Sequence, residues 1–276
     1  MKTLNLSAIL LFLGLTGFSQ NIPPDQKIGG FSHPESVVYD DAREVLYVSN
    51  MGEKKDGDGF ISKVSVEGKI LDLKWITGLQ DPKGLLVHGD KLYVTDKTRL
   101  VEMDIQKGDI LRQFRVEGAQ SLNDITKDET ENIYISDLSG NSNFERNTSG
   151  EISLWMHDEN LQRPNGLLVV GDAIFVSAWG KNSPGNFIKI DLSSKLIEVL
   201  THKGIGNLDG LQKKDAQSFY VSDWAGGKVY SISANGDSRV VISAEKSVGD
   251  ILFFEKNHQL ILPMNIQNEV WIYKLD

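Results

Sequence analysis

The sequence predicts an all-β fold, a six-bladed β-propeller whose ring is closed by an N-terminal strand that pairs with the last blade. Three observations lead to this prediction: a short phrase recurs six times, each copy is followed by an alternating β-branched and aromatic run, and no stretch shows sustained helical periodicity. The six phrases are Pro34-Glu35-Ser36-Val37, Pro82-Lys83-Gly84-Leu85, Leu122-Asn123-Asp124-Ile125, Pro164-Asn165-Gly166-Leu167, Leu208-Asp209-Gly210-Leu211 and Val248-Gly249-Asp250-Ile251.

The spacing of the phrases fixes the type of repeat. Their second residues recur every 40 to 48 positions, which is the period of a four-stranded propeller blade. The first strand of each blade is expected to begin at the phrase.

The second strand of each blade is predicted about ten residues after the phrase, where β-branched and aromatic residues alternate. These runs are 46–49, 92–95, 133–136, 174–177, 219–222 and 260–262. Turn signals such as Glu67-Gly68 and Asn235-Gly236 then separate third and fourth strands, as in 60–66 and 70–75, or 228–233 and 239–242.

The sixth copy has a third strand, Glu269 to Lys274, but no fourth. An unpaired edge there would invite aggregation. We therefore expect the segment Gln26 to Phe31 to complete the last blade, which gives one closed domain over residues 20–276 rather than two domains.

The first 19 residues have the layout of a secretory signal peptide: Lys2, the apolar stretch Leu4 to Leu15, and small residues before the cleavage point. A transmembrane anchor is the alternative, but the apolar stretch is shorter than the roughly 20 residues that a bilayer core requires. The chain has no cysteine, which excludes a lipid-anchored lipoprotein and disulfides. We expect a periplasmic or secreted protein without a membrane anchor after signal cleavage.

The formal net charge of −9 and the absence of a Lys/Arg cluster argue against nucleic acid and anionic lipid as partners. A small molecule or a cation is the expected partner, and nothing in the sequence specifies an oligomeric state.

If each phrase opens an innermost strand, its second residue lies at the axial mouth of the ring. In chain order these residues are Glu35, Lys83, Asn123, Asn165, Asp209 and Gly249. Carboxylate and amide oxygens are the ligands that Ca²⁺ and Mg²⁺ prefer. The alternative is that the Asn and Asp side chains only cap the turns at these positions.

These motifs resemble the senescence marker protein/gluconolactonase/luciferin-regenerating enzyme (regucalcin-like) family. The resemblance rests on Pro34-Glu35-Ser36, Asn123-Asp124, Arg163-Pro164-Asn165-Gly166-Leu167 and Asp209-Gly210-Leu211, each in the matching blade. It implies a divalent metal held by Glu35, Asn165 and Asp209, with Asn123 beside it. Ca²⁺ is the first expectation, and Mg²⁺, Mn²⁺ and Zn²⁺ are alternatives.

Two positions depart from the family pattern. Ser121 stands where enzymatic members often carry an arginine that holds the substrate, and Lys83 adds a cation to the mouth. Lys83 could stabilise a developing oxyanion, or it could take the place of the metal by pairing with Glu35 or Asp209.

The resemblance implies metal-assisted hydrolysis of a sugar-acid lactone or a related ester. Asp209 would accept a proton from water, Asn123 would position the substrate or stabilise the oxyanion, and Lys83 would contact the substrate. Trp179 and Trp224 follow second strands of adjacent blades and could stack on a sugar ring, or could instead pack between blades.

Two further functions remain open. The first is a non-enzymatic propeller that binds a small ligand or a protein at the same mouth, and the second, more distant, is a strictosidine synthase-like activity.

Other polar positions have a structural interpretation. Asp96, Asp137 and Asp223 end three second strands at matching points, and we expect them to order adjacent turns by hydrogen bonds. The segments 51–59, 138–149 and 180–186 are the longest loops expected on the face of the mouth, where they could form a lid or be neutral insertions.

Overall fold

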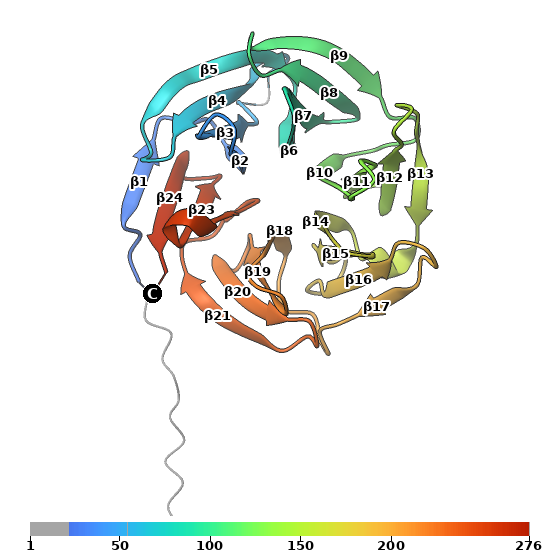
Figure 1. Cartoon of the computed structure of the whole chain (residues 1–276). Coiled ribbons are helices and arrows are strands. Elements are labelled where there is room, and N and C mark those ends of the chain that lie inside the picture. The colour runs from blue at the N-terminus through green and yellow to red at the C-terminus, as the bar shows by residue number, and fades with distance from the viewer. Residues whose placement is uncertain (1–21, 54, 276) are drawn as a thin grey trace, which may run out of the picture.

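The computed structural model describes residues 22–53 and 55–275, which form a ring of six antiparallel four-stranded sheets around a central axis (Figure 1). This confirms the predicted six-bladed propeller. The predicted signal peptide, residues 1–19, lies outside the described residues. Across the described ranges, no helix has the length and apolar character needed to cross a membrane.

In blades 1 to 5 the strands follow one another from the axis to the rim in chain order. Blade 1 contains β2 (Pro34–Asp40), β3 (Val45–Asn50), β4 (Gly59–Ser65) and β5 (Ile70–Leu79); blade 2 contains β6 (Pro82–His88), β7 (Lys91–Asp96), β8 (Arg99–Asp104) and β9 (Asp109–Arg115); and blade 3 contains β10 (Leu122–Lys127), β11 (Ile133–Asp137), β12 (Ser142–Arg146) and β13 (Ile152–His157).

The second half of the ring repeats this order. Blade 4 contains β14 (Pro164–Val170), β15 (Ala173–Ala178), β16 (Phe187–Asp191) and β17 (Ile197–Val199); blade 5 contains β18 (Leu208–Lys213), β19 (Ser218–Asp223), β20 (Lys228–Ser233) and β21 (Ser238–Ser243); and blade 6 contains β22 (Leu252–Phe254), β23 (Gln259–Met264), β24 (Glu269–Lys274) and β1 (Gln26–Gly29). Two short 3₁₀ turns, Glu159–Leu161 and Glu255–Asn257, lie in connections.

The N-terminal strand closes the ring as predicted. β1 runs antiparallel to β24, with Gln26 opposite Ile272 and Gly29 opposite Glu269 (Figure 1). Ile28 is buried in the apolar cluster between the last and first blades. The rim edge of β24 is therefore covered by the other end of the chain.

The inner strand of blade 6 differs from the prediction. Its phrase, Val248 to Ile251, is not part of a strand, and β22 begins only at Leu252. Single bridges join Val248 to Met264 and Asp250 to Ser36 of blade 1. The phrase thus opens a strand in five blades, while in the sixth it forms the seam with the first blade.

The core consists of apolar layers between neighbouring blades. Between blades 4 and 5, for example, the ring centroids of Phe187 and Phe219 lie 5.2 Å apart, and Phe187 is fully buried. Fully burying a side chain of this kind contributes about 1.5–3 kcal/mol. Packing between sheets therefore holds the inner strands at fixed positions around the axis.

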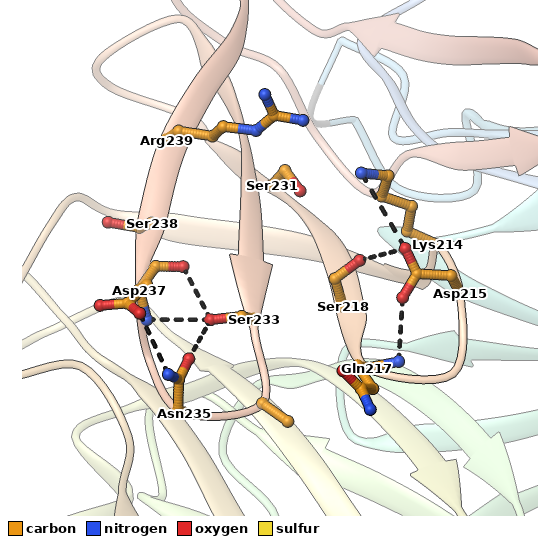
Figure 2. A pocket seen from close by; sticks show the side chains of 11 residues that line it. Lys214, Asp215, Gln217, Ser218, Ser231, Ser233, Asn235, Asp237, Ser238 and Arg239 are labelled. Carbon is orange, nitrogen blue, oxygen red and sulfur yellow. Dashed lines mark hydrogen bonds and ion pairs between the residues drawn. The ribbon is translucent and has the colours of Figure 1, made fainter.

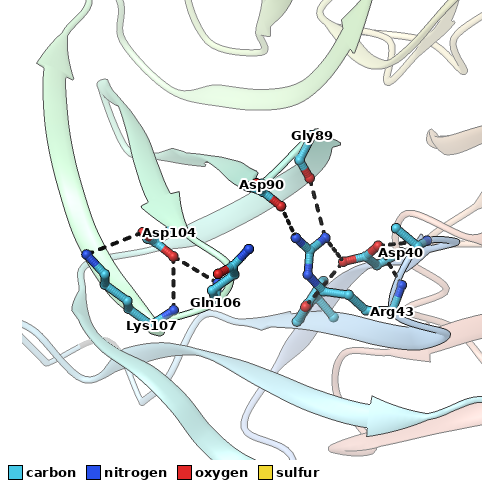
Figure 3. Close-up of polar contacts among 9 residues, drawn as sticks. Asp40, Arg43, Gly89, Asp90, Asp104, Gln106 and Lys107 are labelled. Atoms are coloured by element: carbon cyan, nitrogen blue, oxygen red, sulfur yellow. Dashed lines mark hydrogen bonds and ion pairs between the residues drawn. The ribbon is translucent and has the colours of Figure 1, made fainter.

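Polar contacts join blades 1 and 2 on the face opposite the phrases (Figure 3). The Arg43 guanidinium donates to Asp40 Oδ2 at 2.9 Å and pairs with Asp90, which belongs to the first turn of the next blade. Asp104 orders its own turn by accepting from the backbone amides of Gln106 and Lys107 at 2.9 Å.

Candidate functional site

The polar residues predicted for the mouth lie on five innermost strands. Glu35 is on β2, Lys83 on β6, Asn123 on β10, Asn165 on β14 and Asp209 on β18, each as the second residue of its strand. All are buried except Lys83, whose side chain is 13% exposed. Gly249, the sixth phrase residue, precedes β22 and has no side chain to offer.

A bulge follows the start of each of these strands. The register shifts between Pro34 and Val37, between Pro82 and Leu85, and at the matching points of the next three blades. The second phrase residue is therefore left out of the regular ladder in all five blades, and the third in all but blade 4, where Gly166 pairs with Ser177. Strict alternation does not fix the directions of the residues left out.

Hydroxyl groups on the second strands fix the backbone of the mouth. Ser136 Oγ accepts from the amide of Asp124 at 2.8 Å and donates to the carbonyl of Asn165 in the next blade at 2.6 Å. Ser222 Oγ likewise accepts from Gly210 N at 2.7 Å and donates to Gly249 O at 2.8 Å. Thr95 and Ser177 donate to the carbonyls of Asn123 and Asp209.

The seam between blades 6 and 1 is built differently. Pro263 occupies the second-strand position that carries a hydroxyl in the other blades. The amide of Asp250 instead donates directly to the carbonyl of Glu35 at 2.7 Å.

The third phrase residues add two carboxyl groups that sequence reasoning left without a role. Asp124 accepts from the amides of Leu167 at 2.6 Å and Ile125 at 2.7 Å. Asp250 Oδ2 accepts from the hydroxyl of Ser36 at 2.6 Å. The other phrases have glycine or serine here. Aspartate in only the third and sixth phrases was the signal that could have identified this pair.

Glycine at the third position allows close approach of the next blade. A Cβ atom added to Gly84 would lie 2.6 Å from Asn123 O and from Asp124 Cα. One added to Gly210 would lie 2.3 Å from Ile251 N. Real Cβ contacts are not this short, so these glycines hold the inner strands together around the axis.

Burial and mutual repulsion raise the pKa values of the mouth carboxyls. Burial, followed by the charges of Asp209 and other carboxyls, raises the pKa of Glu35 well above its usual value. Burial and the charge of Asp250 raise the pKa of Asp209 to about 8. The Lys83 ammonium opposes both shifts, so its positive charge acts on the same two carboxyls.

Asp124 and Asp250 line a cavity of about 340 Å³ whose other walls are largely apolar, formed by residues such as Val37, Leu85 and Leu167. Burial and the charge of Asp250 raise the pKa of Asp124, and burial raises the pKa of Asp250 to about 7. The axis thus holds more carboxyl groups than it can keep ionised together without a compensating cation.

Within the described part of the chain, two oxygen atoms at the mouth have no hydrogen-bond partner. Both Glu35 Oε2 and Asn165 Oδ1 are buried, while Asn165 Nδ2 donates to Leu208 O at 3.1 Å. Asp209 lies on the inner strand next to that of Asn165, and carboxylate and amide oxygens are the ligands that a hard divalent cation prefers. Among the described residues, no group of three or more His, Asp or Glu side chains forms a metal cluster.

The two tryptophans contact each other on the face of the mouth. The ring centroids of Trp179 and Trp224 lie 5.8 Å apart at an angle of 50°, and both rings are half-buried. Asn207 links them through their backbones, donating to Trp179 O and accepting from Trp224 N at 2.9 Å. Both tryptophan rings therefore pack between neighbouring blades, and stacking of a sugar ring on them remains a prediction.

The strand-ending aspartates order backbone, as expected. Asp96 accepts from the amides of Gln80 and Asp81. Equivalent contacts are made by Asp137 with Gln120, Ser121 and Gly140, and by Asp223 with Asn207 and Gly226.

The prediction of a long loop over residues 138–149 is largely wrong, because Ser142–Arg146 forms β12. The connection 179–186 contributes instead to a cavity of about 410 Å³ lined by Trp179, Asn207 and Asp223. This cavity lies on the same face as the mouth.

The fold and site define a six-bladed propeller with a buried, carboxyl-rich axis. No family model and no curated protein matches the chain. Solved structures do share the fold. A gluconolactonase from Xanthomonas campestris aligns with a TM-score of 0.74 at 15% identity, covering 90% of this chain and 88% of that one.

Virginiamycin B lyase from Staphylococcus aureus, solved as an inactive variant with quinupristin, aligns with a TM-score of 0.63 at 13% identity, covering 91% of this chain and 99% of the lyase. A streptogramin B lyase gives 0.64 at 13% identity, covering 91% of this chain and 87% of the other. At these identities the likeness shows a shared propeller fold.

Proposed function

We propose that the protein is a metal-dependent hydrolase that opens a sugar-acid lactone or a related ester at the axial mouth. The supporting observation is the pair of buried, unpartnered oxygens Glu35 Oε2 and Asn165 Oδ1 beside Asp209. Leaving such atoms without a partner costs about 1–3 kcal/mol each, a cost that a bound cation removes.

Glu35, Asn165 and Asp209 would hold the cation, with Ca²⁺ as the first candidate. When bound, a divalent cation polarises a carbonyl oxygen and lowers the pKa of water. Asp209 is the residue proposed to accept the proton. Burial and the charge of Asp250 raise its pKa to about 8, while the Lys83 ammonium favours the ionised form that can accept a proton.

Asn123 and Lys83 complete the proposed site. Asn123 offers an amide that can donate to the substrate carbonyl oxygen. Lys83 would stabilise negative charge that develops on the same oxygen. The choice of a lactone is supported by the fold shared with the Xanthomonas gluconolactonase and by the polar side chains that the second phrase residues bring to the mouth. The predicted signal peptide supports a periplasmic or secreted location for the proposed activity.

The test combines metal binding with a substrate screen. Purified protein would be titrated calorimetrically with Ca²⁺, Mg²⁺, Mn²⁺ and Zn²⁺, and then assayed with aldonolactones, a neutral aryl ester and quinupristin. We expect metal-dependent ring opening above the spontaneous rate, lost with EDTA and in Glu35→Gln. A protein that binds none of the four ions and turns over none of the substrates would contradict the proposal.

A second candidate is a non-enzymatic ligand-binding propeller, favoured by Lys83. Because its ammonium acts on both Glu35 and Asp209, the carboxyls have an internal counter-ion. In that case the protein would bind an aldonolactone without metal and release it unchanged.

A further inference from the structure

A groove on blade 5, remote from the mouth, has the features of a second binding site (Figure 2). It has a volume of about 810 Å³, within the range of roughly 300–1,000 Å³ typical of small-molecule sites. The turns 214–217 and 234–237 form part of its wall. Since β18 starts at the mouth, these turns lie at the opposite face of the ring.

Two cations and the hydroxyl of the largely buried Ser231 converge in this groove. The Lys214 ammonium and the Arg239 guanidinium point toward each other across the space above Ser231 (Figure 2). Within the described ranges, the Arg239 side chain forms no ion pair or hydrogen bond. Ser231 is 6% exposed, and its hydroxyl has no partner among the same residues. Like charges brought together over an unpartnered hydroxyl indicate a place for an anion.

The other blades show what blade 5 lacks. Ser231 lies opposite Tyr220 on one side and Arg239 on the other. The matching third-strand positions of blades 1 to 4 carry long charged side chains, namely Lys63, Glu102, Glu145 and Lys189. Three of them face an opposite charge on the fourth strand: Lys63 faces Asp72, Glu102 faces Arg112 and Lys189 faces Glu198.

Blade 2 is the closest parallel. The Glu102 carboxylate lies 2.8 Å from Lys91 Nζ, accepts from the Tyr93 hydroxyl at 3.1 Å and faces Arg112 across the ladder. Blade 5 keeps the tyrosine, the arginine and a lysine, since Lys214 Nζ lies 5.7 Å from the centroid of the Tyr220 ring. The lysine of blade 5 comes from the turn before β19, since Ser218 stands at the strand position of Lys91. The carboxylate is replaced by the short side chain of Ser231.

The rest of the groove is rich in hydrogen-bonding groups. Asp215 lies 4.0 Å from Lys214 Nζ, but its oxygens already accept from the Ser218 hydroxyl and from Gln217 N (Figure 2). Asn235 and Asp237 at the far end present amide and carboxylate oxygens that can accept from hydroxyl groups.

We infer that this groove binds an acidic saccharide. Its oxyanion takes the place between Lys214 and Arg239 that the Glu102 carboxylate has in blade 2, and accepts from the Ser231 hydroxyl. Its sugar hydroxyls bond to the amide and carboxylate groups near Asn235. This site is separate from the mouth, so Glu35→Gln should leave its affinity unchanged.

Calorimetry at low ionic strength with D-galacturonate, D-galactose 6-sulfate, D-galactose and inorganic sulfate tests the inference. We expect one or both acidic sugars to bind, D-galactose to bind at least about tenfold more weakly, and Arg239→Gln or Lys214→Gln to weaken acidic-sugar binding at least about tenfold. Lys213→Gln is the matched control, because it removes the same charge from an exposed neighbour that does not line the groove. It should change affinity less than twofold.

Ser231→Glu provides an independent variant. It restores the carboxylate of blade 2, so it should pair with Lys214 and Arg239, raise the melting temperature and abolish binding of the acidic sugars. Absence of binding by the parent protein, equal binding of D-galactose, equal losses in Lys213→Gln and Arg239→Gln, or full binding by Ser231→Glu would each overturn the inference. Inorganic sulfate binding as tightly as both sugars would show an inorganic anion site and also overturn it.

Discussion

The amide of Asp250 donates a 2.7 Å hydrogen bond to the carbonyl of Glu35, which joins the sixth blade to the first at the mouth. Glu35 is a proposed metal ligand, and the negative charge of Asp250 raises the pKa of Asp209. The geometry of the mouth therefore depends on closure of the ring, although the closing strand β1 lies at the rim.

Removing β1 should thus damage both stability and the site. Deletion of residues 21–31 exposes the edge of β24 and removes Ile28 and Phe31 from the cluster between blades 6 and 1. We expect aggregation and a large drop in melting temperature, measured by light scattering and thermal unfolding. Deletion of residues 22–24 alone, ahead of the strand, is the control and should behave like the parent.

Ca²⁺ should stabilise the parent protein, because a ligand that binds only the folded state shifts unfolding by mass action. At a concentration one hundred times Kd the gain is about 2.7 kcal/mol. Thermal unfolding should show this gain in the parent and not in Glu35→Gln, which keeps the size of the side chain and removes its charge. An equal shift in the two proteins would place the metal elsewhere.

Asp209→Asn should separate metal binding from proton transfer. The amide keeps an oxygen ligand but cannot accept a proton, so the rate of lactone opening should fall by about 10²- to 10⁴-fold, with weaker metal binding. Rates are to be compared at saturating metal. A variant that keeps the parent rate under these conditions would exclude Asp209 as the base.

Lys83→Met tests whether the ammonium replaces or assists the metal. If Lys83 serves as the internal counter-ion, its loss leaves Glu35 and Asp209 uncompensated and should raise Ca²⁺ affinity about tenfold or more. If it assists hydrolysis, Ca²⁺ affinity stays level and the rate falls. Calorimetry and turnover measured on one preparation distinguish the two, and no change in either would show that Lys83 has no part in the site.

The buried carboxyls also predict an unusual dependence of stability on pH. Their folded pKa values, about 7 for Asp250 and about 8 for Asp209, exceed the unfolded value of 3.8, so the folded state retains protons that the unfolded chain releases. Their stabilising contribution is complete below about pH 4 and is lost as pH rises through the folded pKa values.

Without divalent metal, urea unfolding should show a lower midpoint at pH 8 than at pH 5. Asp250→Asn should reduce this difference because an amide does not titrate. Asp109→Asn, on the exposed strand β9, should retain it. A parent protein equally stable at both pH values would argue that these carboxyls keep ordinary pKa values.

The six blades could be predicted from the sequence because each blade has its own phrase, its own run of alternating residues and its own turn signals. Closure by β1 could also be predicted, because the sixth copy of the repeat lacks a fourth strand and the segment Gln26 to Phe31 had no other assignment. β12 was missed because Ser142–Arg146 is polar and lacks β-branched residues, and the pairing with β11 and β13 outweighs that composition.

At the mouth, the second phrase residues could be predicted from blade register alone. The positions of Asp124 and Asp250 could not be predicted in this way. Regular alternation directs adjacent side chains to opposite faces, and only the bulge allows two neighbouring side chains to face the axis. The groove of blade 5 was also missed. It depends on a cross-strand comparison of Ser231 with Glu102, which requires the exact pairing of strands.

The pairing of β1 with β24 has a consequence for biosynthesis. Gly29 leaves the ribosome early, but its partner Glu269 is made only after the strands of the five intervening blades. As the chain emerges N-terminus first, from the ribosome or after export, blades 1 to 5 can form hairpins from local contacts while the first blade still lacks its neighbour at the seam. The mouth would therefore acquire its final shape only after β24 has been made and has paired with β1.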